Sequence, residues 1–232
     1  MIAVVLAKTK MGKNICVGAA EVASGRPLRL IPAKQPDRKY GSWVRFDPAV
    51  GDTIELVGSP APDIQPPHVE DFLVERFNRI GPLGQPLHEW IAKHCKVWTG
   101  PPACLFDGCL RVSGRGWRWL SRGPRMPAGS VGFWRLPFGL ERADEGGKIR
   151  YCHRAGLGNA SNINLSFVAN DQIPPAVIAP GTLVRVSLAR WWSPEGASEG
   201  AENEEYEKCW LQLSRVYPVD EARVPTRTDI PF

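Results

Sequence analysis

Residues Ile2–Ile31, IAVVLAKTKMGKNICVGAAEVASGRPLRLI, decide the fold of the first part of this chain. The stretch contains three apolar, β-prone runs: Ile2–Ala7, Asn14–Val22 and Leu28–Ile31. Polar, Gly- and Pro-containing turns separate the runs, at Lys8–Lys13 and at Ser24–Pro27. Short β-prone runs bounded by such turns are typical of a meander of antiparallel strands. We therefore predict that the chain opens with three short strands.

Short strands also account for most of the remaining sequence. Further candidates are Ser42–Phe46, Thr53–Val57, Ala103–Phe106, Leu110–Ser113, Gly116–Leu120, Val131–Leu136, Lys148–His153 and Asn162–Ala169. Residues Val69–Ile80 fit either a strand or a helix, whereas Gln85–Val97 has helical spacing of its apolar residues. The β-rich runs Thr182–Ser193 and Lys208–Tyr217 flank a loop rich in glutamate and predict a hairpin.

This pattern divides the chain into two β-rich halves, each about the size of a small barrel. Its 232 residues allow one large domain or two of ordinary size. We predict an all-β protein with one or two short helices. It would consist of a first β-barrel over residues 1–80, a helical linker over 81–100, and a second β-barrel over 101–232 that carries the acidic loop 193–207.

The net charge of +5 understates how basic most of the chain is. Residues Ser193–Glu207 contain six glutamates and no Lys or Arg, so the rest of the chain carries +11. Nine Lys or Arg residues lie between Met1 and Arg45, against only two acidic residues. A field of this sign attracts polyanions, with a strong dependence on salt.

A second basic region runs over Cys109–Leu140, CLRVSGRGWRWLSRGPRMPAGSVGFWRLPFGL. It holds six arginines and three tryptophans and lacks Asp and Glu. Guanidinium groups pair with phosphate, and indole rings stack on bases or cations. Arginine and aromatics without carboxylates are typical of a surface that contacts nucleic acid. The alternative is that the tryptophans are core and the arginines a solvated strand face.

Nothing in the sequence indicates catalysis, a metal site or a cofactor. HExxH and phosphate-binding glycine loops are missing. Of the six cysteines, only Cys104 and Cys109 are closely spaced, and a structural zinc site usually needs two close pairs. The sequence also lacks a signal-peptide pattern and any window near the ~20 apolar residues of a membrane span. We expect a non-enzymatic cytoplasmic protein, without a membrane partner and with reduced thiols.

The chain resembles the dual OB-containing domain family. The resemblance rests on Ile2–Ala7 and its Lys/Gly turn, then Ile15–Ala19, Leu28–Pro32, Thr99–Phe106 and the closing hairpin. It spans nearly the whole chain, although the arginine-rich segment Gly108–Met126 and the acidic loop depart from the family pattern. The resemblance implies two OB folds, membership of prokaryotic conflict or anti-phage systems, and a non-catalytic role in contacting nucleic acid.

These observations nominate phosphate-contacting and base-stacking residues in both halves. In the first half they are Lys8, Lys10, Lys13, Arg29, Trp43 and Arg45; in the second they are Arg115, Arg118, Arg122, Arg135, Arg190 and Trp191. Along a strand Trp117 and Trp119 share one face, and Arg118 points to the other. We expect the tryptophans to be core and Arg118 to meet solvent.

The predicted function is non-catalytic binding of RNA or single-stranded DNA, as an accessory protein of a prokaryotic defence system. Two alternatives stay open. The barrels could form a scaffold subunit that docks an acidic protein partner, with tryptophans as interface anchors. A basic pocket could instead sense a nucleotide second messenger. The acidic loop could mimic nucleic acid, hold a partner, cover a basic groove, or be a solvated loop.

Overall fold

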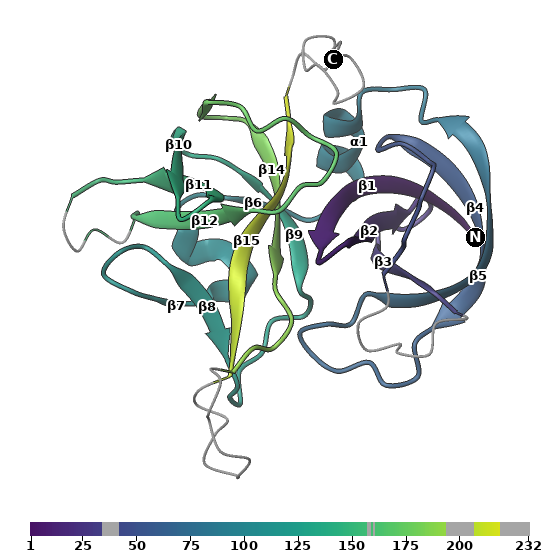
Figure 1. Ribbon diagram of the computed structural model, residues 1–232, viewed down its shortest axis with the longest axis horizontal. Helices are drawn as coiled ribbons and strands as arrows, with labels where there is room; N and C mark the ends of the chain where they lie inside the picture. Colours follow the sequence, from purple (N-terminus) through teal and green to yellow (C-terminus); the bar gives the residue numbers. More distant parts are fainter. Residues whose placement is uncertain (34–41, 157–158, 160, 194–206, 219–232) are drawn as a thin grey trace.

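The computed structural model describes residues 1–33, 42–156, 159, 161–193 and 207–218. In this part the chain is mainly β-structure, with the α-helix α1 (Leu87–His94) and the 3-10 helix η2 (Pro102–Gly108). Figure 1 shows a β-barrel beside a second and larger sheet. The predicted all-β, OB-like fold class is confirmed.

The first strands form a closed five-stranded barrel. They are β1 (Ile2–Met11), β2 (Asn14–Glu21), β3 (Pro27–Pro32), β4 (Asp52–Pro60) and β5 (Asp71–Pro82). Pairing runs in the order β1-β2-β3-β5-β4 and returns to β1, and β3 and β5 are parallel. Inward-pointing residues fill the interior, among them Val5, Val17, Leu30, Ile54 and Phe72.

The remaining strands build what we call the C-terminal sheet. They are β6 (Val97–Thr99), β7 (Arg111–Val112), β8 (Arg118–Ser121), β9 (Val131–Arg135), β10 (Leu140–Glu145), β11 (Lys148–His153), β12 (Ile163–Phe167), β13 (Val177–Ile178), β14 (Leu183–Leu188) and β15 (Lys208–Tyr217). Their order is β13-β10-β11-β12-β15-β14-β9-β6, and the β7–β8 hairpin joins β15 at the side.

The C-terminal sheet repeats the connectivity of the barrel. The strands β9 and β10 are separated by four residues, 136–139, and act as one interrupted first strand. From β10 the pairing runs through β11, β12, β15 and β14 and comes back to β9, with β12 and β15 parallel. The parallel pair therefore joins the third and fifth strands in both halves.

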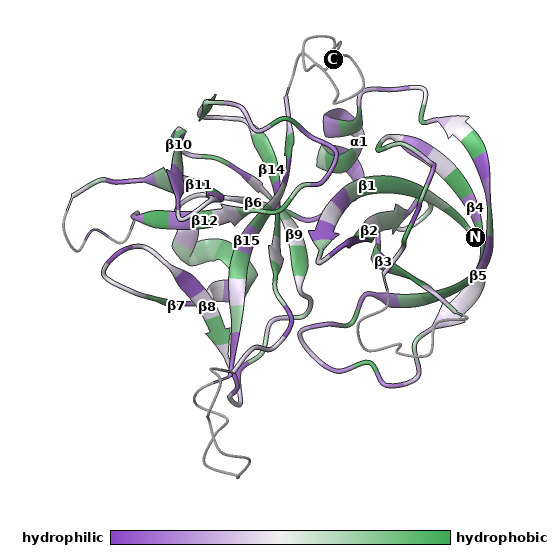
Figure 2. Cartoon of the chain, in the orientation of Figure 1, coloured by the Kyte–Doolittle hydropathy of each residue, from purple (hydrophilic) through white to green (hydrophobic). Residues whose placement is uncertain are grey.

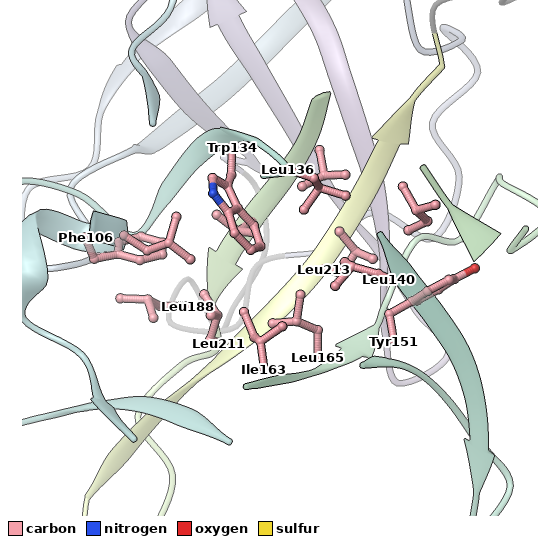
Figure 3. Packing of buried hydrophobic residues seen from close by; sticks show 14 of the residues in the cluster. Phe106, Trp134, Leu136, Leu140, Tyr151, Ile163, Leu165, Leu188, Leu211 and Leu213 are labelled. Carbon is pink, nitrogen blue, oxygen red and sulfur yellow. The ribbon is translucent and has the colours of Figure 1, made fainter. Parts of the chain in front are cut away.

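One large apolar cluster fills the inside of the C-terminal sheet. Figure 3 shows Trp134, Leu213, Leu165 and Tyr151 converging from different strands on this interior. Phe106 of η2 closes the cluster from one side and is 1% exposed. The helix η2 replaces the strand that we predicted over Ala103–Phe106. Phe106 and Asp107 both have positive φ, so the backbone here bends too sharply to continue a strand.

Other predicted elements agree with the structure or are extended by it. Residues Val69–Ile80, which fitted either a strand or a helix, belong mainly to the strand β5. The predicted hairpin is the antiparallel pair β14–β15. The turn is shorter than the predicted Lys8–Lys13, because pairing between β1 and β2 continues to Met11 and Asn14. Of the strand predicted over Ser42–Phe46, only one bridge forms, between Trp43 and Ile15.

The two halves share a third apolar cluster, which we call the seam. Val4 and Leu6 of β1 point away from the barrel interior and pack with Phe133, Leu183 and Tyr217 of the C-terminal sheet. The apolar side of α1 covers the same cluster with Leu87, Trp90 and Ile91. Figure 2 shows β1 hydrophobic along most of its length and hydrophilic toward its end beside the C-terminal sheet.

A β-bulge at Leu6 adds a specific hydrogen bond to the seam. The register of β1 against β2 shifts between Val5 and Ala7, so Leu6 lacks a partner residue there. The hydroxyl of Tyr217 donates to the Leu6 carbonyl oxygen at 2.8 Å, and Tyr217 is 1% exposed. The strand β15 is thereby tied to β1.

Polar groups continue the seam beyond its apolar part. The Asp71 carboxylate accepts hydrogen bonds from Nε and Nη2 of Arg29, at 2.6 and 2.8 Å. It also accepts one from Nη2 of Arg190, at 2.7 Å. His68 is buried, and its Nε2 lies 3.6 Å from Sγ of Cys209. Burial, with Arg29 as a lesser cause, lowers the pKa of His68 from 6.5 to about 4.

We expect Tyr217→Phe to lower the free energy of unfolding by about 1–3 kcal/mol, because the buried Leu6 carbonyl loses its donor. Chemical denaturation of both proteins measures the difference. A variant as stable as the original chain would show that the bulge carbonyl is satisfied in another way.

We also expect stability to fall as pH decreases from 6.5 toward 4. His68 stays neutral in the folded chain down to about pH 4, whereas it protonates near pH 6.5 when unfolded, so its contribution is present above 6.5 and lost on acidification. The difference corresponds to roughly 3 kcal/mol. Denaturation curves of His68→Gln across this range should show a shallower acid slope. An unchanged slope would contradict the assignment.

Candidate nucleic-acid interface

From Lys208 to Leu213, the strand β15 alternates its side chains between two faces. Cys209, Leu211 and Leu213 are buried in the core of the C-terminal sheet. Lys208, Trp210 and Gln212 alternate with them and are half-buried on the opposite, outer face. The sequence KCWLQL therefore places one cation, one indole and one amide in a row along the outside.

Three indoles meet on this outer face. Trp119 of β8 lies directly opposite Trp210 in the strand pairing, with ring centroids 5.5 Å apart. Trp117, just before β8, meets Trp210 edge to face at 6.5 Å. All three are half-buried, so part of each ring stays accessible. We call these residues, together with Arg150 and Lys208, the tryptophan face.

Cations are interleaved with the indoles. The Arg150 guanidinium carbon lies 4.4 Å from the Trp117 ring centroid. The Lys208 amine lies 5.1 Å from the centroid of Trp119 and 5.7 Å from that of Trp210. Cation–π attraction holds these cations next to the rings. Arg150 also forms an ion pair with the exposed Glu145, at 3.4 Å, whereas Lys208 forms none within the described residues. The face thus offers flat aromatic surface and positive charge side by side.

Arg118 is oriented opposite to our expectation. It is 3% exposed and lies on the inner side of β8, whereas Trp117 and Trp119 point outward. Its Nη2 donates to the Asn162 carbonyl oxygen at 3.4 Å, and burial lowers the pKa of its guanidinium. Alternation along β8 was predicted correctly, but the side that faces the core was wrong.

An open hollow of about 470 Å³ adjoins Trp117. The exposed residues Arg115 and Arg154 lie on its wall, together with Asn162 and Asn164. The Asn164 Oδ1 is buried and has no hydrogen-bond partner within the described residues. Glu145 also lines the hollow, so two arginines and one carboxylate adjoin the indole. The hollow extends the tryptophan face toward Arg115, one of the predicted contacts.

Arg122 and Trp191 form a separate pair at the start of β15. The Arg122 guanidinium stacks 4.6 Å from the Trp191 ring centroid. Arg122 also forms an ion pair with Glu207, the last residue of the predicted acidic loop. The other glutamates of that loop lie at 195–205, outside the described residues. The charge of Arg122 is therefore already matched by a carboxylate.

Two predicted contacts of the first half are engaged inside the barrel. The Lys8 amine donates to the Phe46 carbonyl oxygen at 2.8 Å, and burial lowers its pKa. The Trp43 indole donates to the Leu30 carbonyl oxygen at 2.8 Å and packs edge to face on Phe46 and Phe77. Both side chains stabilise the mouth of the barrel.

The other predicted cations are scattered. Lys10 and Lys13 are exposed at the β1–β2 turn, and Arg45 is exposed beside Asp47. Arg135 donates to the Gly181 carbonyl oxygen at 3.0 Å. Arg29 and Arg190 converge on Asp71 between the two halves. Lys10, Arg29 and Arg190 line one cavity between the two halves, and none of these six positions belongs to the tryptophan face itself.

The usual OB binding face, over strands 2 and 3, is covered in the barrel. Gly18 of β2 and Arg29 of β3 line a cavity whose other wall is Arg185, Ser187 and Arg190 of the C-terminal half. The corresponding strands β11 and β12 of the C-terminal half contribute to the open tryptophan face and its hollow. Arg150, Lys208 and Trp210 were missed because the strands that carry them are distant in sequence.

Within the described residues there is no cluster of three or more His, Cys, Asp or Glu able to hold a metal ion. All six cysteines are free thiols. None of the described helices combines the length and the apolar character that crossing a membrane requires.

Comparison with known proteins leaves this chain without an assigned family. No family model matches it, and no curated protein matches it. Among solved structures, a murine DNA-binding protein bound to double-stranded DNA aligns over 92% of this chain and 91% of its own, with 9% sequence identity and a TM-score of 0.28. So low a TM-score does not establish a shared fold, and the chemistry of this chain rests on its own residues.

Proposed function

We propose that this protein binds single-stranded nucleic acid, RNA or DNA, on the tryptophan face without catalysing a reaction on it. The observation that carries the proposal is the set of three adjoining indoles interleaved with Arg150 and Lys208. Unpaired bases have free π-faces that stack on aromatic rings, while cations beside the rings meet the phosphates. A duplex hides those faces, so a single strand fits better.

The geometry of Arg150 supports this proposal. A planar guanidinium stacked on an indole has a second face on which a base can stack. Because Arg150 is paired with Glu145, it would contribute by stacking rather than by an unpaired charge. Lys208, a point charge between two rings, suits a phosphate between two stacked bases. The hollow beside Trp117 adds Arg115 and Arg154 as further phosphate contacts.

We further propose that the protein serves as an accessory component of a prokaryotic defence system. The support is the resemblance of its sequence to the dual OB-containing domain family. A binding panel of RNA, single-stranded DNA, double-stranded DNA and cyclic nucleotides tests the function. Salt-sensitive binding of single strands supports it; binding of cyclic nucleotides alone would favour the sensor alternative, and binding of none would favour a protein scaffold.

We expect Trp210→Ala to weaken binding of a labelled single-stranded oligonucleotide tenfold or more, because stacking contributes about 1–3 kcal/mol per base. Fluorescence anisotropy measures the affinity, and thermal unfolding shows whether the variant folds. Arg45→Ala is the control, since Arg45 is exposed on the barrel, apart from the tryptophan face. Equal affinities of Trp210→Ala and the original protein would contradict stacking at this position.

We expect Lys208→Gln to reduce the salt dependence of binding. Each phosphate contact on a single strand contributes about 0.7 to the slope of log affinity against log salt concentration. Arg122→Gln should change the slope less, because Glu207 already pairs with Arg122. Titrations at several salt concentrations measure both. If Arg122→Gln lowers the slope more than Lys208→Gln, the phosphates follow another path.

A further inference from the structure

A cavity of about 280 Å³ lies between the barrel and the C-terminal sheet. We call it the seam cavity. Its wall contains four cationic side chains, from Lys10, Arg29, Arg185 and Arg190. The volume is near the lower end of the roughly 300–1,000 Å³ that small-molecule sites occupy. It suits one nucleotide rather than a folded segment of a partner.

Arg185 is the central observation. It is 6% exposed, and its Nη1 donates to the Ser214 hydroxyl at 3.0 Å. Within the described residues no carboxylate forms an ion pair with it. Gly18 makes room for it, because a Cβ there would lie 2.7 Å from the Arg185 Nη2. Burying a cation that makes no ion-pair contact is costly, and an anion in the cavity would offset part of that cost.

The other charges leave a positive surplus. Arg29 and Arg190 share the single carboxylate of Asp71. The carboxylate of Glu70 accepts hydrogen bonds from the backbone and hydroxyl of Ser130, at 2.6 and 2.7 Å. Lys10 is exposed, and its amine has no hydrogen bond or ion pair within the described residues. Four cations against two carboxylates favour a ligand with two negative charges.

The strand β15 connects the cavity to the tryptophan face. Gln212 lies two residues beyond Trp210 on the same outer side, about 7 Å along the strand. Gln212 lines the seam cavity together with Lys10 and Arg190. In Figure 1, β15 runs from the β8 hairpin at one end to the neighbourhood of β1 and β9. A single-stranded nucleic acid that lies on the indoles therefore reaches the cavity within about one nucleotide.

We infer that the seam cavity binds the phosphorylated end of the single strand that occupies the tryptophan face. The recognised chemistry is a phosphate monoester on a nucleotide, whose doubly negative charge only a strand end, and not an internal phosphodiester, can provide. Lys10, Arg185 and Arg190 would contact the phosphate, and Gln212 the adjoining nucleotide. This inference rests on the proposed function and adds to it a preference for phosphorylated ends.

The test compares three oligonucleotides of one sequence, with a 5′-phosphate, a 3′-phosphate or hydroxyls at both ends. We expect one phosphorylated form to bind roughly tenfold tighter than the hydroxyl form, the size of one charge-assisted hydrogen bond. Lys10→Gln should abolish this preference. Lys13→Gln is the matched control, because Lys13 is exposed in the same turn and does not line the cavity. Arg185→Gln, checked by thermal unfolding, should act like Lys10→Gln.

Equal binding of all three oligonucleotides would overturn the inference, and so would a preference that survives Lys10→Gln. If the three forms bind equally and Trp210→Ala weakens all of them, binding at the tryptophan face is supported and the phosphate-end site is contradicted. If none of the oligonucleotides binds, the proposed function itself fails. The last measurement adds a free nucleoside monophosphate as a competitor. If it displaces the phosphorylated oligonucleotide, the two share a site. If it binds while the oligonucleotides show no preference for a phosphorylated end, the assignment of the cavity to a strand end is overturned.

Discussion

Burial of β1 on both faces is the constraint on which the rest of the structure depends. Its odd residues Ala3 and Val5 fill the barrel, and its even residues Val4 and Leu6 fill the seam. A strand covered on both sides needs a continuous apolar run rather than an alternating one. That is why IAVVLA shows no polar interruption before Lys8. Docking of the halves is built into the first strand.

The sequence predicted most of the strands, but not which face of each strand packs against the core. Turn residues and apolar runs located the opening meander and the β14–β15 hairpin. Alternation cannot say which face of a strand meets the core, so Arg118 was placed outward although it is buried. The segment ACLF looks β-prone, yet positive φ at Phe106 bends it into η2. Arg150 and Lys208 become neighbours of the tryptophans only through strand pairing, which no local pattern encodes.

Basic residues were abundant in the sequence, and the structure separates them by environment. Lys8 is held by a carbonyl oxygen in the barrel, Arg122 is matched by Glu207, and Arg29 and Arg190 divide one carboxylate. A cation already paired within the protein gains little from a phosphate, since it exchanges one partner for another. Arg150 is likewise paired, with Glu145, whereas Lys208 lies beside two indoles and forms no ion pair within the described residues. Charge counts therefore overstate the binding surface, and burial with pairing defines it.

The matching connectivity of the two halves separates their roles. In both five-strand circuits the third and fifth strands run parallel. The barrel turns β2 and β3 toward the seam cavity, whereas the C-terminal half leaves β11 and β12 at the tryptophan face and carries the β7–β8 hairpin. The same circuit is thus used once as a support and once to present an exposed surface.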